Sequence, residues 1–105
     1  MIKANEAHAR TEANITNIKT ITYNYMDELA PSIEKEILEA TRDCSKCCTI
    51  AISRVDLASK GITSESQKKY FMTSAEAYLT ALGYAVTTHE TFSNGVAIVI
   101  DWEKV

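Results

Sequence analysis

The sequence contains very little glycine and proline, with three glycines and one proline in 105 residues. Both residue types are enriched in linkers and disordered segments, so their scarcity argues against a disordered chain. With 46% hydrophobic and 24% charged residues, the composition is that of an ordinary globular protein. A chain of this length suffices for one core and is too short for two. We therefore expect a single domain over residues 1–105.

The chain also lacks a long apolar run. No stretch approaches the roughly 18 residues that a membrane-spanning helix needs. The first residues, MIKANEAH, do not form the apolar segment of a secretory signal peptide. These absences predict no membrane association and no secretion by a signal peptide, which favours a cytoplasmic location.

Basic clusters are absent as well. Eleven Lys and Arg stand against fourteen Asp and Glu, for a net charge of −3, and Lys68-Lys69 is the only adjacent basic pair. A nucleic-acid-binding protein normally presents a concentrated positive patch. We therefore do not expect nucleic acid as a partner.

The first thirty residues predict a long helix. Ala4 to Leu29 contains no glycine or proline, and its spacings of four and three give a heptad stripe. Either this amphipathic helix docks on the chain's own core by its C-terminal half, or it packs against another copy or another protein. The candidate interface residues on the stripe are His8, Thr11, Ile15, Ile18, Thr22 and Tyr25. Pro31 is expected to end or kink the helix, and a second helix is expected from Ser32 to about Arg42 or Cys44.

Two further elements follow. The stretch CCTIAIS, residues 47–53, is short and β-branched, which favours a buried strand. Ser64 and Gln67 form the sequence pattern of a capping box, and an apolar face continues to Gly83, so a third helix is predicted over Glu65–Leu82.

The C-terminus predicts a β-hairpin around Asn94-Gly95, with strands at residues 84–91 and 96–102. A two-residue loop would divide the apolar side chains between the two faces. A three-residue loop with Gly95 in the left-handed conformation pairs Phe92 with Val96 and places the bulky groups on one side, so we expect that register.

The predicted order is therefore α-α-β-α-β-β, an α+β fold with helices on one face of a three-stranded sheet. Residues 1–30 form a long helix that can project, and residues 31–105 form the compact core. The first strand is expected to pair in parallel with one hairpin strand, through a crossover. The other sheet face would carry Thr87, His89, Thr91, Ala97, Val99 and Asp101.

Three cysteines, Cys44, Cys47 and Cys48, form the most conspicuous chemical cluster. Structural zinc normally has four ligands, and a redox C-x-x-C pair normally lies at a helix N-terminus, whereas this one follows a predicted helix C-terminus. We expect small apolar residues at a helix-to-strand junction, although an odd count leaves a disulfide to another copy open. No cofactor and no metal ligand are predicted.

No catalytic signature is present. The sequence contains no phosphate-binding loop, dinucleotide-binding, metalloprotease or nucleophile-elbow motif. His89 and Asp101 would be diagonal neighbours in the expected hairpin, but no nucleophile accompanies them. We predict that the protein is not an enzyme and has no catalytic residues.

The segment AYLTALGYAVTTHETFSNGVAIVIDW, residues 77–102, resembles the C-terminal half of small uncharacterised proteins of tailed bacteriophages. The shared features are a helix ending in LGY, an alternating strand, a polar glycine turn and a last strand that ends on Trp. The resemblance implies a phage origin and a location in the virion or the host cytoplasm. We expect a non-enzymatic structural protein, such as a capsid, neck or tail accessory subunit, acting as a homo-oligomer or within a larger assembly. The alternative is a host-takeover inhibitor or anti-defence protein that binds a bacterial protein or a signalling nucleotide.

Overall fold

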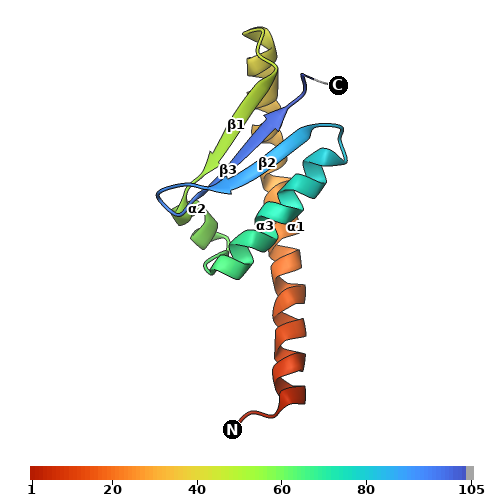
Figure 1. The fold of residues 1–105 in the computed structure, drawn as a ribbon, viewed down its shortest axis with the longest axis vertical. Coiled ribbons are helices and arrows are strands. Elements are labelled where there is room, and N and C mark those ends of the chain that lie inside the picture. The colour runs from red at the N-terminus through yellow and green to blue at the C-terminus, as the bar shows by residue number, and fades with distance from the viewer. Residues whose placement is uncertain (104–105) are drawn as a thin grey trace.

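Over the described residues, three helices and three strands make up the fold (Figure 1). The structure, a computed structural model, describes residues 1–103. Its elements are α1 (Ala4–Arg42), β1 (Cys47–Ile52), α2 (Arg54–Ser59), α3 (Glu65–Thr80), β2 (Ala85–Glu90) and β3 (Val96–Asp101). The α+β class, the three-stranded sheet and the C-terminal hairpin are confirmed. The order is α-β-α-α-β-β, because the first two predicted helices are one and the chain after β1 forms the short helix α2.

Helix α1 continues through Pro31, so of the two expected effects of this proline, an end or a kink of the helix, the first was wrong. Proline removes one N–H, which leaves the carbonyl of Asp27 without its helical partner. Asp27 and Pro31 are both exposed, so water can satisfy that carbonyl, while Met26 and Ile33 are buried on the opposite side of the helix. The expected boundary at residue 30 therefore does not coincide with a break in structure.

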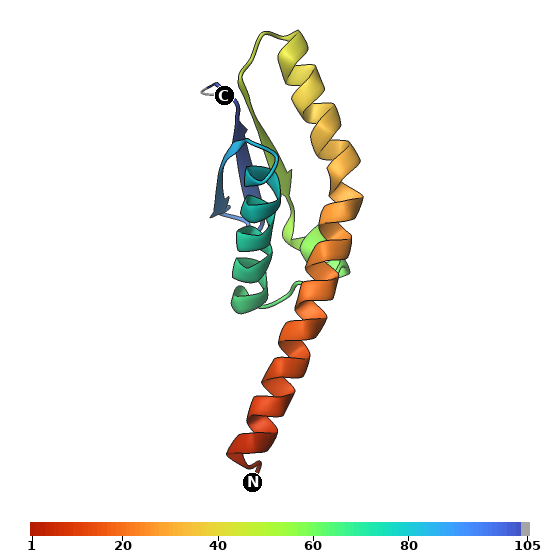
Figure 2. The ribbon, with the colours of Figure 1, turned by 90° about the vertical axis from the view of Figure 1, so that its right-hand side faces the viewer.

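Helix α1 sets the length of the molecule. Its 39 residues correspond to about 58 Å at 1.5 Å per residue, and the longest dimension of the structure is 59 Å. Every residue from Ala4 to Asn14 is exposed, and Ile18 is the first buried one. The start of the helix thus projects away from the body, as Figure 2 shows.

The sheet has the order β1-β3-β2, and both neighbouring pairs are antiparallel. The expected parallel pairing of the first strand with a hairpin strand was therefore wrong. β1 and β2 do run in the same direction, as a crossover through α2 and α3 requires, but β3 lies between them. The third strand thus separates the two parallel strands and pairs with each.

The hairpin register differs from the expected one by two residues. Glu90 pairs with Val96 and Val86 with Ile100, so the loop holds five residues, 91–95. A shift of two leaves every side chain on its predicted face, and the apolar groups of β3 do face the core. Phe92 is the exception, since it lies in the loop and is fully exposed.

The role of Gly95 in this loop differs from the expected one. Asn94, with φ of 63°, takes the left-handed conformation that was expected at Gly95. Glycine is required at position 95 for a different reason, since a Cβ there would collide with the carbonyl oxygen of Ile52. The hairpin loop therefore packs closely against the end of β1 at Gly95.

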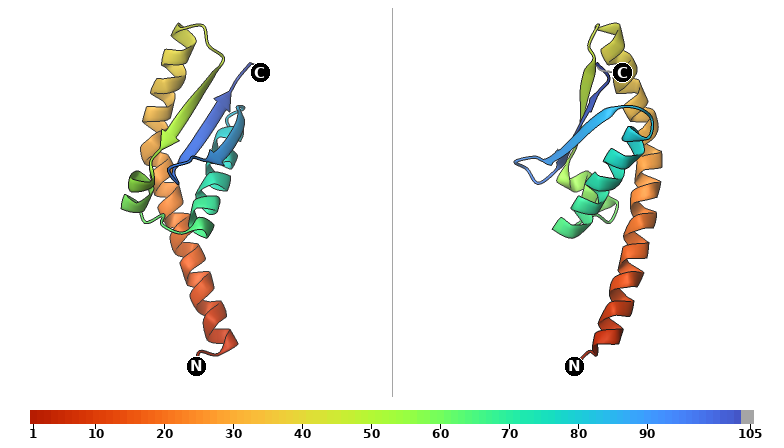
Figure 3. Two further views of the ribbon diagram at one scale, coloured as in Figure 1. Left: turned by 60° about the vertical axis from the view of Figure 1, so that its left-hand side comes forward. Right: turned by 45° about the vertical axis from the view of Figure 1, so that its right-hand side comes forward.

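Helices α1 and α3 pack on one face of the sheet and leave the other face open (Figure 3, left). The predicted capping box of Ser64 and Gln67 is present at the start of α3. In the core the Tyr25 ring of α1 stacks on Phe71 of α3, with 5.4 Å between ring centroids. The largest fully buried side chains are Phe71, Leu57, Leu79, Ile98, Ile100, Val96 and Thr22.

Candidate interaction surfaces

An apolar groove lies between the C-terminal half of α1 and the C-terminal end of α3. We call it the helix groove, and it has a volume of about 320 Å³. Its lining residues are Ala30, Ile33, Glu34, Ile37, Leu38, Tyr78, Leu79, Leu82 and Tyr84. Only one of these nine residues, Glu34, is charged, so the groove is apolar along most of its length.

Large apolar side chains in the helix groove are exposed to solvent. Leu38 is 51% exposed, Tyr78 41% and Leu82 64%. A second hollow, lined in part by Leu82, Tyr84 and Trp102, continues the apolar surface toward the end of β3. Isolated exposed leucines are common, but a contiguous apolar surface usually marks a binding site.

The sequence did not single out this surface. Tyr78 and Leu82 belong to the apolar stripe from which the third helix was predicted, and such a stripe normally faces the core. The stripe contains Phe71 and Leu79, which are buried, as well as Tyr78 and Leu82, which are exposed. It is therefore wider than the face that α3 buries against the core. That width is the signal from which exposure of part of the stripe could have been inferred.

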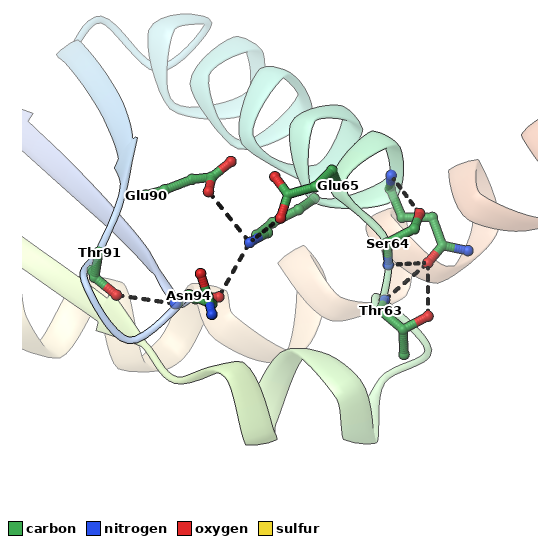
Figure 4. A network of polar contacts seen from close by, with 9 residues as sticks. Thr63, Ser64, Glu65, Glu90, Thr91 and Asn94 are labelled. Carbon is green, nitrogen blue, oxygen red and sulfur yellow. Dashed lines mark hydrogen bonds and ion pairs between the residues drawn. The ribbon is translucent and has the colours of Figure 1, made fainter.

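Lys68 is the most buried charged residue in the part of the chain that the structure describes, with 7% of its side chain exposed. Its ammonium lies 3.0 Å from Glu65 Oε1 and 3.4 Å from Glu90 Oε2, and it donates to the carbonyl oxygen of Asn94 (Figure 4). The hydrogen bond from Lys68 lowers the pKa of Glu65. The hydrogen bond to Glu65 raises the pKa of Lys68, against the opposing effect of burial. The network ties α3 to the hairpin loop.

The candidate interface residues of α1 fall into two groups. Ile18, Thr22 and Tyr25 are buried in the chain's own core, so their positions on the stripe are explained by packing within the chain and they offer no free surface. His8 and Thr11 are exposed on the projecting start of α1, and Ile15 is half-buried. For these three, a role in an interface stays a prediction.

The three cysteines are free thiols. Cys44 lies in the turn after α1 with φ of 61°, and Cys47 begins β1, where it is exposed. Cys48 faces the helices and is half-buried, and burial together with the nearby Glu36 carboxylate raises its pKa. Within residues 1–103, no group of three or more His, Cys, Asp and Glu is close enough to hold a metal ion.

His89 and Asp101 are not neighbours, contrary to expectation. His89 pairs with Ala97, whereas Asp101 pairs with Ala85. The two positions are therefore four residues apart along the hairpin, which corresponds to about 13 Å. The cause is the two-residue shift in register. The structure thus does not bring His89 and Asp101 together as an acid–base pair.

Comparisons with known proteins provide no relatives. No family model matches the chain, and neither a curated protein nor a solved structure is significantly similar to it. None of the helices within the described part of the chain is both long enough and apolar enough to cross a membrane.

Proposed function

We propose that this protein is a non-enzymatic interaction subunit and that the helix groove is the surface with which it binds another protein. The observation that carries the proposal is the cluster of Leu38, Tyr78 and Leu82, three large apolar side chains that stay exposed beside one another. Covering them removes apolar surface from water, at about 25 cal/mol for each Å². A protein partner supplies a surface large enough to do so.

The occupant that fits this groove is the apolar face of a helix from the partner. Both walls are helices, so a third helix can insert its side chains between them as helices do when they pack. An added strand is a poorer fit because a side chain already occupies part of the nearest sheet edge, β2. There, Glu76 Oε1 accepts hydrogen bonds from both the backbone N–H and the hydroxyl of Thr88.

Co-purification from the native source tests the proposal. The wild-type chain should retain one stoichiometric partner, and the double variant Leu38→Glu/Leu82→Glu should lose it. Val55→Glu is the matched control, since Val55 is 71% exposed but lies outside the groove. The identified partner should then bind the purified protein directly. Equal binding by the double variant would contradict the proposal.

The resemblance to phage proteins supports a more specific form, a minor virion component. Mass spectrometry of purified virions should then detect the protein at a fixed ratio to the major capsid protein. A protein that is absent from virions and binds a host protein through the helix groove would instead be an inhibitor or an anti-defence protein.

A further inference from the structure

The two edges of the sheet differ in how their backbone groups are satisfied. Trp102 donates its backbone N–H to the carbonyl of Lys46, the residue opposite it when the β1–β3 register is continued by one position. Hydrogen-bonded positions alternate along an antiparallel pair, so the even-numbered residues of β1 bond to β3. The N–H and C=O groups of Cys47, Thr49 and Ala51 therefore point away from the sheet.

These outward groups have no hydrogen-bond partner among residues 1–103. The other edge contrasts with this one, because Glu76 binds the outward N–H of Thr88 in β2. An open edge of this kind is a template for pairing with another strand. Cys47, Thr49 and Ala51 also carry small, exposed side chains, so the side chains of β1 itself do not cover the edge.

A groove runs along this edge between β1 and α1, which lie side by side in Figures 2 and 3. We call it the β1 groove, and its volume is about 330 Å³. Tyr25 and Leu29 of α1 and Ile50 and Ile52 of β1 provide apolar walls. A strand added to β1 would place every second side chain into this space.

We propose that the strand that occupies the β1 groove is β1 of a second copy of this chain, so that two three-stranded sheets join into one of six strands. The pairing is antiparallel about a two-fold axis, which makes the interface self-complementary. Only an axis at Thr49 engages all three outward residues of each copy, pairing Thr49 with itself and Cys47 with Ala51. Ile50 and Cys48 of each copy then enter the groove of the other.

Charge complementarity favours a second copy over an unrelated strand. The charged residues that line the β1 groove are Glu36 and Asp56, and both are acidic. The segment that would enter, KCCTIAISR, residues 46–54, has basic residues at its two ends and no acidic residue. In the two-fold arrangement, Lys46 of the second copy lies opposite Ile52 near Asp56, and Arg54 of the second copy lies toward the end that holds Glu36.

Disulfide trapping tests the register. In a background without native thiols (Cys44→Ser, Cys47→Ser, Cys48→Ala), Thr49→Cys should give a covalent dimer under mild oxidation. Directly opposed, hydrogen-bonded residues have Cα atoms about 5.5 Å apart, within the roughly 4.4–6.8 Å of disulfides. Thr87→Cys, exposed on the same sheet face, is the control and should stay monomeric. Equal cross-linking of the two variants would overturn the proposal.

Two further variants test the interface in the native-cysteine chain. Thr49→Pro removes an outward N–H but no bond to β3, so the fold should persist while sedimentation shows monomer instead of dimer. Glu36→Lys should weaken dimerisation about tenfold through like-charge repulsion, whereas Glu39→Lys, the same change outside the groove, should not. A wild-type chain that is monomeric at high concentration would overturn the proposal. The proposed dimer does not depend on the helix groove, so the double variant Leu38→Glu/Leu82→Glu should dimerise normally.

Discussion

The two phenylalanines of this chain occupy opposite environments. Phe71 is completely buried and stacks on Tyr25, whereas Phe92 is fully exposed in the hairpin loop. We expect Phe71→Ala to lower the free energy of unfolding by about 3–5 kcal/mol, because it leaves a cavity in the core. Phe92→Ala should change it by less than about 0.5 kcal/mol. Urea denaturation measures both, and a comparable loss for the two variants would contradict the loop and its register.

At the same scale, the Lys68 network makes stability depend on pH at both extremes. The pKa of Glu65 is lowered by Lys68, so its contribution is fully present above the unfolded value, roughly 4.3, and is lost as the pH falls through the folded pKa. The pKa of Lys68 is raised by Glu65. Its contribution is fully present below the unfolded value, roughly 10.4, and is lost as the pH rises through the folded pKa.

Lys68→Met should therefore be less stable than wild type at neutral pH, by a margin that shrinks toward acid and toward strong alkali. Urea midpoints measured across the pH range give this difference. Lys69→Met is the matched control, because Lys69 is the exposed neighbour with the same charge. A margin that stays constant at every pH would show that these ion pairs do not contribute.

At the scale of elements, Pro31 is the clearest conflict between local preference and the observed helix. Proline in a helix interior costs about 3 kcal/mol relative to alanine, and here the packing of Met26 and Ile33 against the body outweighs it. Pro31→Ala should raise the free energy of unfolding by about 1–3 kcal/mol, as measured by chemical denaturation. Ser32→Ala, at the exposed next position, should have little effect. Destabilisation by Pro31→Ala would mean that a bend at this residue is required for α1 to follow the sheet.

Periodicity predicted which faces of the elements are buried, but not how the elements connect. The apolar face of β3 was predicted correctly because burial selects the parity of the register, and a shift of two residues preserves it. Because the expected and the observed registers bury the same side chains, burial could not distinguish the expected loop length from the observed one. The fusion of the two predicted helices into α1 depends on tertiary packing that no local pattern reports. The exposure of Tyr78 and Leu82, in contrast, is indicated only by the width of the apolar stripe to which they belong.

At the scale of the whole molecule, the start of α1 projects from the body and adds no buried side chain to the core. Deleting residues 1–14 should change the free energy of unfolding by less than about 0.5 kcal/mol, since every residue removed from α1 is exposed. Urea denaturation of the shortened chain checks this, and a large loss would show that the segment contacts the body. A change in sedimentation on deletion would support the interface predicted for His8 and Thr11.

The position of Trp102 has a practical consequence. It is the only tryptophan in the chain, half-buried, with the ring of Tyr84 edge-on at 6.2 Å, in the hollow that adjoins the helix groove. Indole emission shifts to shorter wavelength when water is displaced from the ring. Trp102 is therefore an intrinsic fluorophore beside the helix groove. A titration of the unlabelled protein with a partner can report whether the groove becomes covered.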